Sequence, residues 1–215
     1  FSLKQEERLF AGEESTFTPR KALRWLGEKA FWITSITGDK LLNEARGVIL
    51  QSIKTGRPLG ETILALSAVF APYIGDEGVI GDEKQSEPYR LETIVRTNTT
   101  DAYNHGRLTE FVKKEMLPFL NGVRYSAVLD ERTTEVCRFL NGKVFKPIED
   151  ALEQLLPPNH FNCRSIVVPV VLGEQVQAAD CITAEEICRA KSLADTKFLS
   201  LHVDLWRVYR EKTTA

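Results

Sequence analysis

The chain has 215 residues, which is enough for one large domain or two small ones around a hydrophobic core. Hydrophobic residues make up 43% and charged residues 27%, a composition typical of globular and not of disordered proteins. The formal net charge of -2 argues against a dedicated nucleic-acid-binding protein, which needs an excess of Lys and Arg on one face, but it leaves room for a local basic patch.

Cysteine content and hydropathy narrow the class of protein further. Four cysteines are too few for a disulfide scaffold at this length and fit a reducing cytoplasm, with either buried thiols or a metal site. The longest apolar run, residues 63–74, is interrupted by Ser67 and Pro72 and is shorter than the roughly 20 residues of a membrane span. We expect no signal peptide and, because the chain begins at Phe1, a processed product or part of a longer protein.

The first 85 residues are predicted to be mostly helical. After an irregular arm over residues 1–20, apolar residues at three-to-four spacing predict helices from about Pro19, over 41–53 and over 59–70. Bulky aromatics in this region, Phe70 among them, could fill a core or contact a partner. Residues 75–88 are rich in Gly, Asp and Glu, and they predict a loop between two halves of the chain.

A long helix is predicted over residues 89–116, with a polar block in its middle. Residues 97–101 read Thr-Asn-Thr-Thr-Asp and are poor helix formers, so either the helix kinks there or these side chains have partners. Arg96 and Asn104 lie eight residues apart on one helix face, which suggests a buried hydrogen-bond network with strands. His105 is expected to be a solvated or capping side chain.

Short elements fill the rest of the chain. We predict strands at 124–129 and 166–171, short helices at 133–140 and 149–156, and a helical tail from Ala184 that ends in an aromatic and basic segment with Trp206. Pro169 places its strand at a sheet edge or near a strand end. Thr133 or Thr134 is the predicted cap of the first short helix. Cys181 and Cys188, seven residues apart, are predicted to lie on the core face of one helix.

Two segments carry a specific resemblance. Residues 125–137 read Tyr-Ser-Ala-Val-Leu-Asp-Glu-Arg-Thr-Thr-Glu-Val-Cys, and residues 157–165 read Pro-Pro-Asn-His-Phe-Asn-Cys-Arg-Ser. Together with the Arg96-Thr97 pair and the downstream Asn104, they resemble the head-morphogenesis domain of tailed phages, the Mu F-like family. The resemblance covers residues 89–172.

The resemblance implies a metal-site pattern with one departure. Many family members carry Cys-x-x-Cys in the first segment and His-x-x-Cys in the second, four ligands in the spacing of structural zinc. Here Thr134 stands at the first cysteine position, so Cys137, His160 and Cys163 remain, with Asp130 as a candidate fourth ligand. The alternatives are a metal-free knot of the same buried side chains and a disulfide between the two cysteines.

Three further side chains near this pattern have structural or catalytic interpretations. Asp130 is either a catalytic carboxylate or, as we favour, a helix cap or the ion-pair partner of Arg164. Thr133 belongs to the same motif. Cys137 and His160 are also a conceivable nucleophile and base, although no oxyanion hole accompanies them, and no nucleotide-binding glycine loop or hydrolase motif occurs in the sequence.

These observations predict an α+β protein with three regions: helices over 1–85, the Mu F-like domain over 86–175 and a helical tail over 176–215. The resemblance implies a minor head protein, not an enzyme, located in the virion near the portal vertex and made in the host cytoplasm. Its expected partners are the portal protein or the major capsid protein, and viral DNA during packaging or ejection. The alternatives are a zinc-assisted hydrolase or nuclease and a DNA-binding accessory protein.

Overall fold

A computed structural model describes residues 23, 39–73, 87–146, 150–195 and 198. The predicted α+β class is confirmed. Its elements are α3 (Asp39–Thr55), α4 (Leu59–Phe70), η1 (Ala71–Tyr73), α5 (Glu87–Phe111), η2 (Leu117–Phe119), β1 (Leu120–Ser126), α6 (Glu135–Leu140), β2 (Val144–Phe145), α7 (Asp150–Leu155), β3 (Ile166–Val171), η3 (Ala178–Asp180) and α8 (Ala184–Leu193). Among these helices, none has the length and apolar character needed to cross a membrane.

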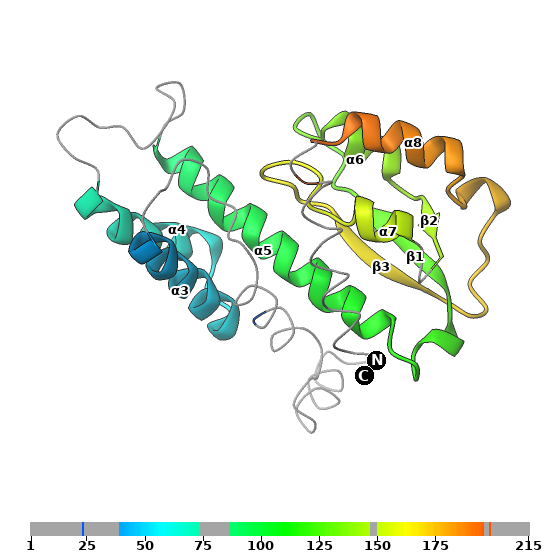
Figure 1. The fold of residues 1–215 in the computed structure, drawn as a ribbon, viewed down its shortest axis with the longest axis horizontal. Helices are drawn as coiled ribbons and strands as arrows, with labels where there is room; N and C mark the ends of the chain where they lie inside the picture. Colours follow the sequence, from blue (N-terminus) through cyan, green and yellow to red (C-terminus); the bar gives the residue numbers. More distant parts are fainter. Residues whose placement is uncertain (1–22, 24–38, 74–86, 147–149, 196–197, 199–215) are drawn as a thin grey trace, which may run out of the picture.

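Helix α5 lies between two layers of the structure (Figure 1). On one side it packs against α3 and α4, and on the other it runs beside the sheet that α6, α7 and α8 accompany. Its first half contributes Leu91, Ile94 and Val95 to a core with α3 and α4. Its last turn contributes Leu108 and Phe111 to a second core with the sheet and short helices. One helix therefore links the two cores.

The helical pair forms where the apolar spacing predicts it. In α3, Leu41, Ala45, Ile49 and Ile53 recur every four residues and are all buried, so they form one stripe against α4 and α5. Gly56 ends α3 with a φ of +66°, a left-handed conformation that glycine adopts without steric cost. Phe70 at the end of α4 is buried, which assigns this aromatic side chain to the core.

The sheet has three antiparallel strands in the order β2-β1-β3, which makes β3 an edge strand as Pro169 predicted. Its outer edge is blocked. The Val167 N–H is bonded to the Asn104 side chain, and Pro169, two residues further along the same edge, has no N–H. At the opposite edge, Ile182 N–H bonds to Val144 O of β2. Neither edge offers the free backbone ladder to which another strand would add.

Several element boundaries differ from the sequence predictions. The long helix ends at Phe111, five residues earlier than expected, and no kink interrupts it at the polar block. Strand β1 begins at Leu120 and not at 124, because a register shift between Leu120 and Gly122 extends its pairing with β3. The segments around Pro19 and Trp206 lie outside the described residues.

Two predictions about individual side chains are wrong. Cys181 and Cys188 are exposed and do not share a helix face. Thr183 caps α8 in a reciprocal pair with Glu186, so the helix begins after Cys181. His105, expected in solvent or at a helix cap, is 2% exposed and lies 3.4 Å from the Asp101 carboxylate one turn earlier in α5. Its burial reflects the position of α5 between two layers.

Candidate functional site

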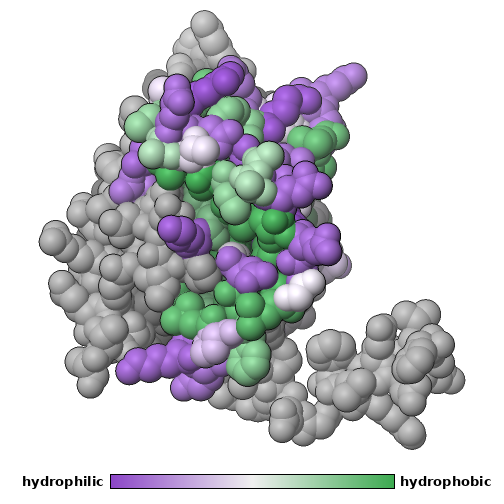
Figure 2. All heavy atoms as spheres, turned by 90° about the vertical axis from the view of Figure 1, so that its right-hand side faces the viewer, coloured by the Kyte–Doolittle hydropathy of each residue, from purple (hydrophilic) through white to green (hydrophobic). Residues whose placement is uncertain are grey.

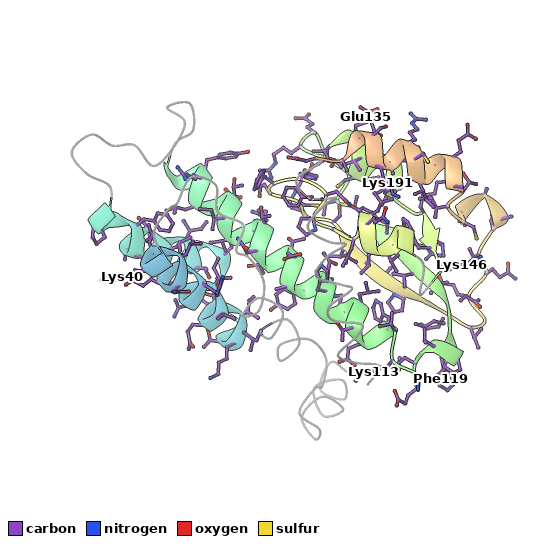
Figure 3. The ribbon with its side chains drawn as sticks, viewed as in Figure 1. Lys40, Lys113, Phe119, Glu135, Lys146 and Lys191 are labelled. Carbon is purple, nitrogen blue, oxygen red and sulfur yellow. The ribbon has the colours of Figure 1, made fainter. Side chains whose placement is uncertain are left out.

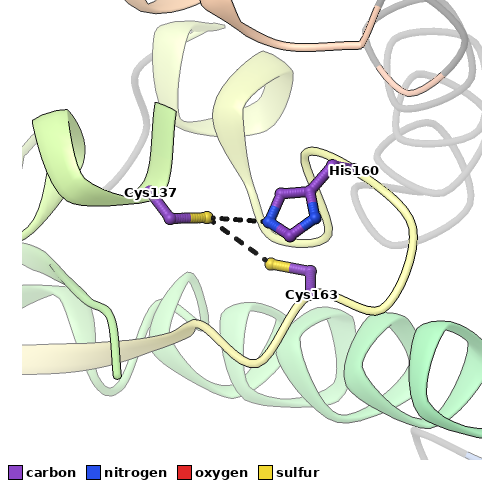
Figure 4. Close-up of side chains that lie close together, drawn as sticks. All are labelled: Cys137, His160 and Cys163. Atoms are coloured by element: carbon purple, nitrogen blue, oxygen red, sulfur yellow. Dashed lines mark hydrogen bonds between the residues drawn. The ribbon is translucent and has the colours of Figure 1, made fainter. Parts of the chain in front are cut away.

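Three side chains from two separate segments meet beside α6 (Figure 4). The Cys137 Sγ of α6 lies 3.2 Å from His160 Nε2 and 3.7 Å from Cys163 Sγ, both from the loop between α7 and β3. All three ligand atoms lie within 4.8 Å of one another. Both cysteines are buried, and His160 is half-buried. The structure thus brings together three of the four sequence-predicted metal ligands.

Local structure explains how α6 presents Cys137. Thr134 is the N-cap of α6, and Cys137 follows three residues later in the first turn, where its side chain faces the core. The Thr134 side chain makes no capping hydrogen bond. Its Oγ1 is buried and has no hydrogen-bond partner among the placed atoms. Thr134 stands at the sequence position where the resemblance implies a first cysteine.

The polar block of α5 anchors the opposing loop. Thr97 Oγ1 accepts a hydrogen bond from the Asn162 N–H at 2.8 Å, and Thr100 Oγ1 donates to Cys163 O at 2.8 Å. Asn162 has a φ of +59°, which Asn tolerates better than most residues. The predicted alternative of partnered side chains therefore explains the block. These hydroxyls satisfy backbone groups of the loop that carries His160 and Cys163.

Asn104 extends the same contact to the sheet. Its Nδ2 donates to Ser165 O at 3.1 Å and to Thr100 O at 3.0 Å, while its Oδ1 accepts from Val167 N–H at 3.0 Å. The side chain is fully buried and takes the place of a neighbouring strand along the start of β3. Arg96, predicted on the same face, does not join this network. It pairs instead with Glu92 at 2.6 Å within α5.

Asp130 lies apart from the sulfur cluster and pairs with Arg164. The Arg164 Nη1 and Nη2 donate to the two carboxylate oxygens, each at 2.6 Å. Thr133 Oγ1 accepts from Asp130 N–H at 2.8 Å and donates to its Oδ1. The Arg164 hydrogen bonds hold the pKa of the Asp130 carboxyl well below its usual range. This carboxylate ties the turn before α6 to the loop before β3, as the ion-pair interpretation proposed.

Electrostatics within the cluster centre on Cys137. Hydrogen bonds from Cys163 and then from His160 outweigh burial and lower the pKa of the Cys137 thiol to about 3. The Cys163 hydrogen bond to Cys137, together with burial, raises the pKa of Cys163, so Cys163 remains the S–H donor. Burial alone would lower the pKa of His160, but the hydrogen bond and charge of Cys137 raise it overall. In the metal-free cluster, the Cys163 S–H and His160 therefore favour the thiolate form of Cys137.

Tyr125 and Asn159 complete the surroundings. The fully buried Tyr125 hydroxyl lies 3.2 Å from Cys137 Sγ, and Asn159 Nδ2 donates to the Tyr125 oxygen at 3.1 Å. Both residues belong to the two motifs, but no sequence pattern indicated a role for either of them. Their place beside the cysteines depends on the pairing of β1 with β3, which no local pattern specifies.

The donor set fits a zinc ion with three protein ligands. Two thiolates bound at 2.3 Å in tetrahedral geometry lie about 3.8 Å apart, close to the observed 3.7 Å. His160 Nδ1 lies 2.7 Å from Phe161 O, the backbone contact that orients a ligating imidazole with Nε2 toward the metal. Asp130 lies outside this group of ligand atoms. Both its oxygens are bound to Arg164, so it does not supply the fourth ligand.

Comparison with known proteins identifies the family to which this chain is similar. The chain matches the family described as Phage Mu protein F like protein over residues 43–168, more than half of its length. The match begins within α3, so it extends further toward the N-terminus than the resemblance over 89–172 indicated, and it includes α4.

Two curated relatives agree with this match. The Mu-like prophage FluMu F protein of Haemophilus influenzae (strain ATCC 51907 / DSM 11121 / KW20 / Rd) is 30% identical over 142 residues, which are 63% of this chain and 33% of the relative. The putative capsid assembly protein F of Escherichia phage Mu is 33% identical over 89 residues, 41% of this chain and 20% of the relative. The aligned part of this chain thus spans a third or less of these relatives.

No solved structure matches the chain. The motif residues, their convergence in space and the family match over both cores agree with one another. The chain belongs to the Phage Mu protein F-like family.

Proposed function

We propose that this protein is a minor head protein of a tailed phage or prophage, an assembly component located in the virion near the portal vertex. The observation that carries the proposal is the family match across residues 43–168, supported by a relative named as a putative capsid assembly protein. In this proposal its partners are the portal protein or the major capsid protein. A role in packaging or ejecting viral DNA extends the proposal, and it predicts DNA binding that weakens as salt rises.

An exposed apolar surface is the proposed docking site for a head protein. The end patch consists of Met116, Phe119, Val171 and Leu172, which are between 41% and 61% exposed. Leu172 N–H bonds to Phe119 O, so the two chain segments that carry the patch are adjacent. Figure 2 shows hydrophobic side chains in the middle and lower part of one face of the described structure, and Figure 3, in the view of Figure 1, labels Phe119 near the lower end with Lys113 nearby. Contiguous exposed apolar side chains with a polar rim are typical of protein interfaces.

The sulfur cluster has a structural role in this proposal. Zinc bound by Cys137, Cys163 and His160 would hold α6 against the loop before β3, which the Asp130–Arg164 pair also does. A hydrolytic zinc site needs a position open to substrate, whereas both cysteines here are at most 2% exposed. A site with three protein ligands leaves a fourth position open, but only the half-buried His160 side could expose it, so burial of the cysteines favours a structural site over a hydrolase or nuclease.

Affinity capture from co-expressing cells tests the proposal. The tagged chain is produced with the portal protein, and separately with the major capsid protein, of the phage or prophage that encodes it. We expect recovery of one of the two at a fixed ratio. Recovery of neither, while the captured chain is folded, would overturn the assembly proposal.

Matched variants then test the end patch. Phe119→Ser combined with Leu172→Ser should abolish recovery, whereas Leu64→Ser, at a side chain of α4 that is 72% exposed, should not. Unchanged urea midpoints show that all variants are folded. If the double variant recovers the partner as well as the unaltered chain does, another surface makes the contact. Zinc is tested separately by metal analysis of the purified chain with and without Cys137→Ser.

A further inference from the structure

A cavity opens between α3, α4 and α5, away from the sulfur cluster. Its volume is about 320 Å³, room for roughly ten water molecules at about 30 Å³ each. It lies where the end of α3 and the start of α4 meet the middle of α5, and it is within the size range of ligand pockets. Nothing in the assembly proposal uses it.

The cavity wall carries positive charge. Arg57, just after α3, and Arg96, in α5, both line it, and none of the described lining residues is acidic. Arg57 makes no ion pair with any residue that the structure places. Arg57 supplies the charge that attracts an anion, and Arg96, whose charge Glu92 balances, adds directional N–H donors.

Arg96 has a donor left for a ligand. Its Nη2 is bound to Glu92 at 2.6 Å, but its Nε is buried and has no hydrogen-bond partner among the atoms placed. Nε itself is covered, so an acceptor that enters the cavity would bind the exposed part of the guanidinium group, whose side chain is 27% exposed. The hydroxyl-bearing residues Thr99 and Tyr103 on the same wall offer further polar contacts.

The remaining wall is apolar. Ile53, Leu59 and Val95 contribute aliphatic side chains, so a ligand that fills the cavity presents hydrocarbon as well as negative charge. We propose that this cavity binds an acidic side chain, Glu or Asp, of a protein partner together with an adjacent aliphatic side chain. The site would add a second contact to the assembly function proposed above, but its test needs only the isolated chain.

Charge and shape favour a peptide over DNA. A duplex presents its phosphates on a convex rod, which a cavity of about 320 Å³ between three helices cannot enclose. A single free phosphate would leave the aliphatic wall uncovered. A carboxylate on a flexible, partly apolar side chain satisfies both parts of the wall.

Titration of the full chain with short blocked peptides, followed by NMR, tests the proposal. The probes are Ac-Leu-Glu-Leu-NH2, the same peptide with Gln in place of Glu, inorganic phosphate and a short DNA duplex. We expect the Glu peptide to shift the amide signals of Gly56 and Thr99 in a saturable way. The Gln peptide should bind about tenfold more weakly, the ratio that 1.4 kcal/mol produces.

Variants separate the cavity from general charge effects. Arg96→Gln and Arg57→Gln should each weaken binding of the Glu peptide about tenfold, a factor equivalent to about 1.4 kcal/mol. Arg132→Gln, at an exposed arginine beside α6, should leave it unchanged. The urea midpoint of each variant reports folding, and the second cavity variant serves if the first is unfolded.

Five results would overturn the proposal. Equal affinity for the Glu and Gln peptides, or no shift with either, would show that the cavity does not recognise a carboxylate. Phosphate binding as strong as that of the Glu peptide would reduce the site to a simple anion site. Displacement of the peptide by the duplex would assign the site to DNA. Unchanged peptide affinity in both cavity variants would place the binding elsewhere.

Discussion

Replacing Asn104 with Ala should destabilise the protein strongly, because this side chain joins α5 to β3. The substitution leaves two backbone groups without partners, the Ser165 carbonyl and the Val167 N–H. Each orphaned buried group costs about 1–3 kcal/mol, so the two together cost roughly 2–6 kcal/mol. Part of this cost is recovered, because the buried Asn104 amide is removed and Ala is a better helix former than Asn. We therefore expect the free energy of unfolding to fall by about 2–4 kcal/mol.

Urea denaturation of the unaltered chain and the variant measures this difference. Thr93→Ala is the matched control on the same helix, because its hydroxyl bonds only to Tyr89 O one turn earlier. It should change the free energy of unfolding by less than about 0.5 kcal/mol. Hydrogen exchange adds a local readout, since the Val167 amide should lose protection first in Asn104→Ala. A variant as stable as the control, with Val167 still protected, would refute the role assigned to Asn104.

Three further predictions concern strand β1, the Cys137–His160 contact and the Asp130–Arg164 ion pair. Gly122→Ala should destabilise by about 1–3 kcal/mol, since its new methyl group would lie 2.8 Å from Phe145 O, whereas Gly47→Ala, with nothing within 4 Å, should be neutral or stabilising in the same urea assay. Because the pKa of Cys137 is lowered on folding, its thiolate stabilises the fold fully at pH values above the ordinary thiol pKa. This stabilisation is lost as the pH falls toward about 3. The raised pKa of His160 stabilises the fold fully below about pH 6.5, and this stabilisation changes with pH only above that value. Below about pH 6.5 the Cys137 effect is therefore unopposed, and the metal-free chain should lose stability on acidification. Cys137→Ser should flatten that part of the pH profile, and an unchanged profile would contradict the thiolate assignment. Arg164→Gln should return the pKa of Asp130 toward about 3.9, measured by NMR titration of its carboxyl carbon, and no shift would show that the ion pair is absent in solution.

The sequence predicted those features that local patterns determine. Four-residue spacing from Leu41 to Ile53 located α3, and Pro169 identified an edge strand. The family resemblance correctly implied that Cys137 meets the loop that carries Cys163, and the contact of Asp130 with Arg164 agrees with the ion-pair interpretation of that aspartate.

Features that depend on long-range packing were not predictable in this way. His105 is buried because α5 lies between two layers, and a solvated helix would show the same polar spacing. Arg96 was expected in the buried network, yet a glutamate one turn away is its partner. The cavity beside Arg96 arises where three helices meet, and no segment of the sequence indicates it.

Separation of purified phage particles into DNA-filled heads and tails, followed by quantitative mass spectrometry, tests the assembly proposal most directly. We expect peptides of this chain in the head fraction, at a small fraction of the abundance of the major capsid protein, and none in the tail fraction. Absence of the chain from heads, while it is present in the lysate from which they were purified, would contradict the assembly proposal.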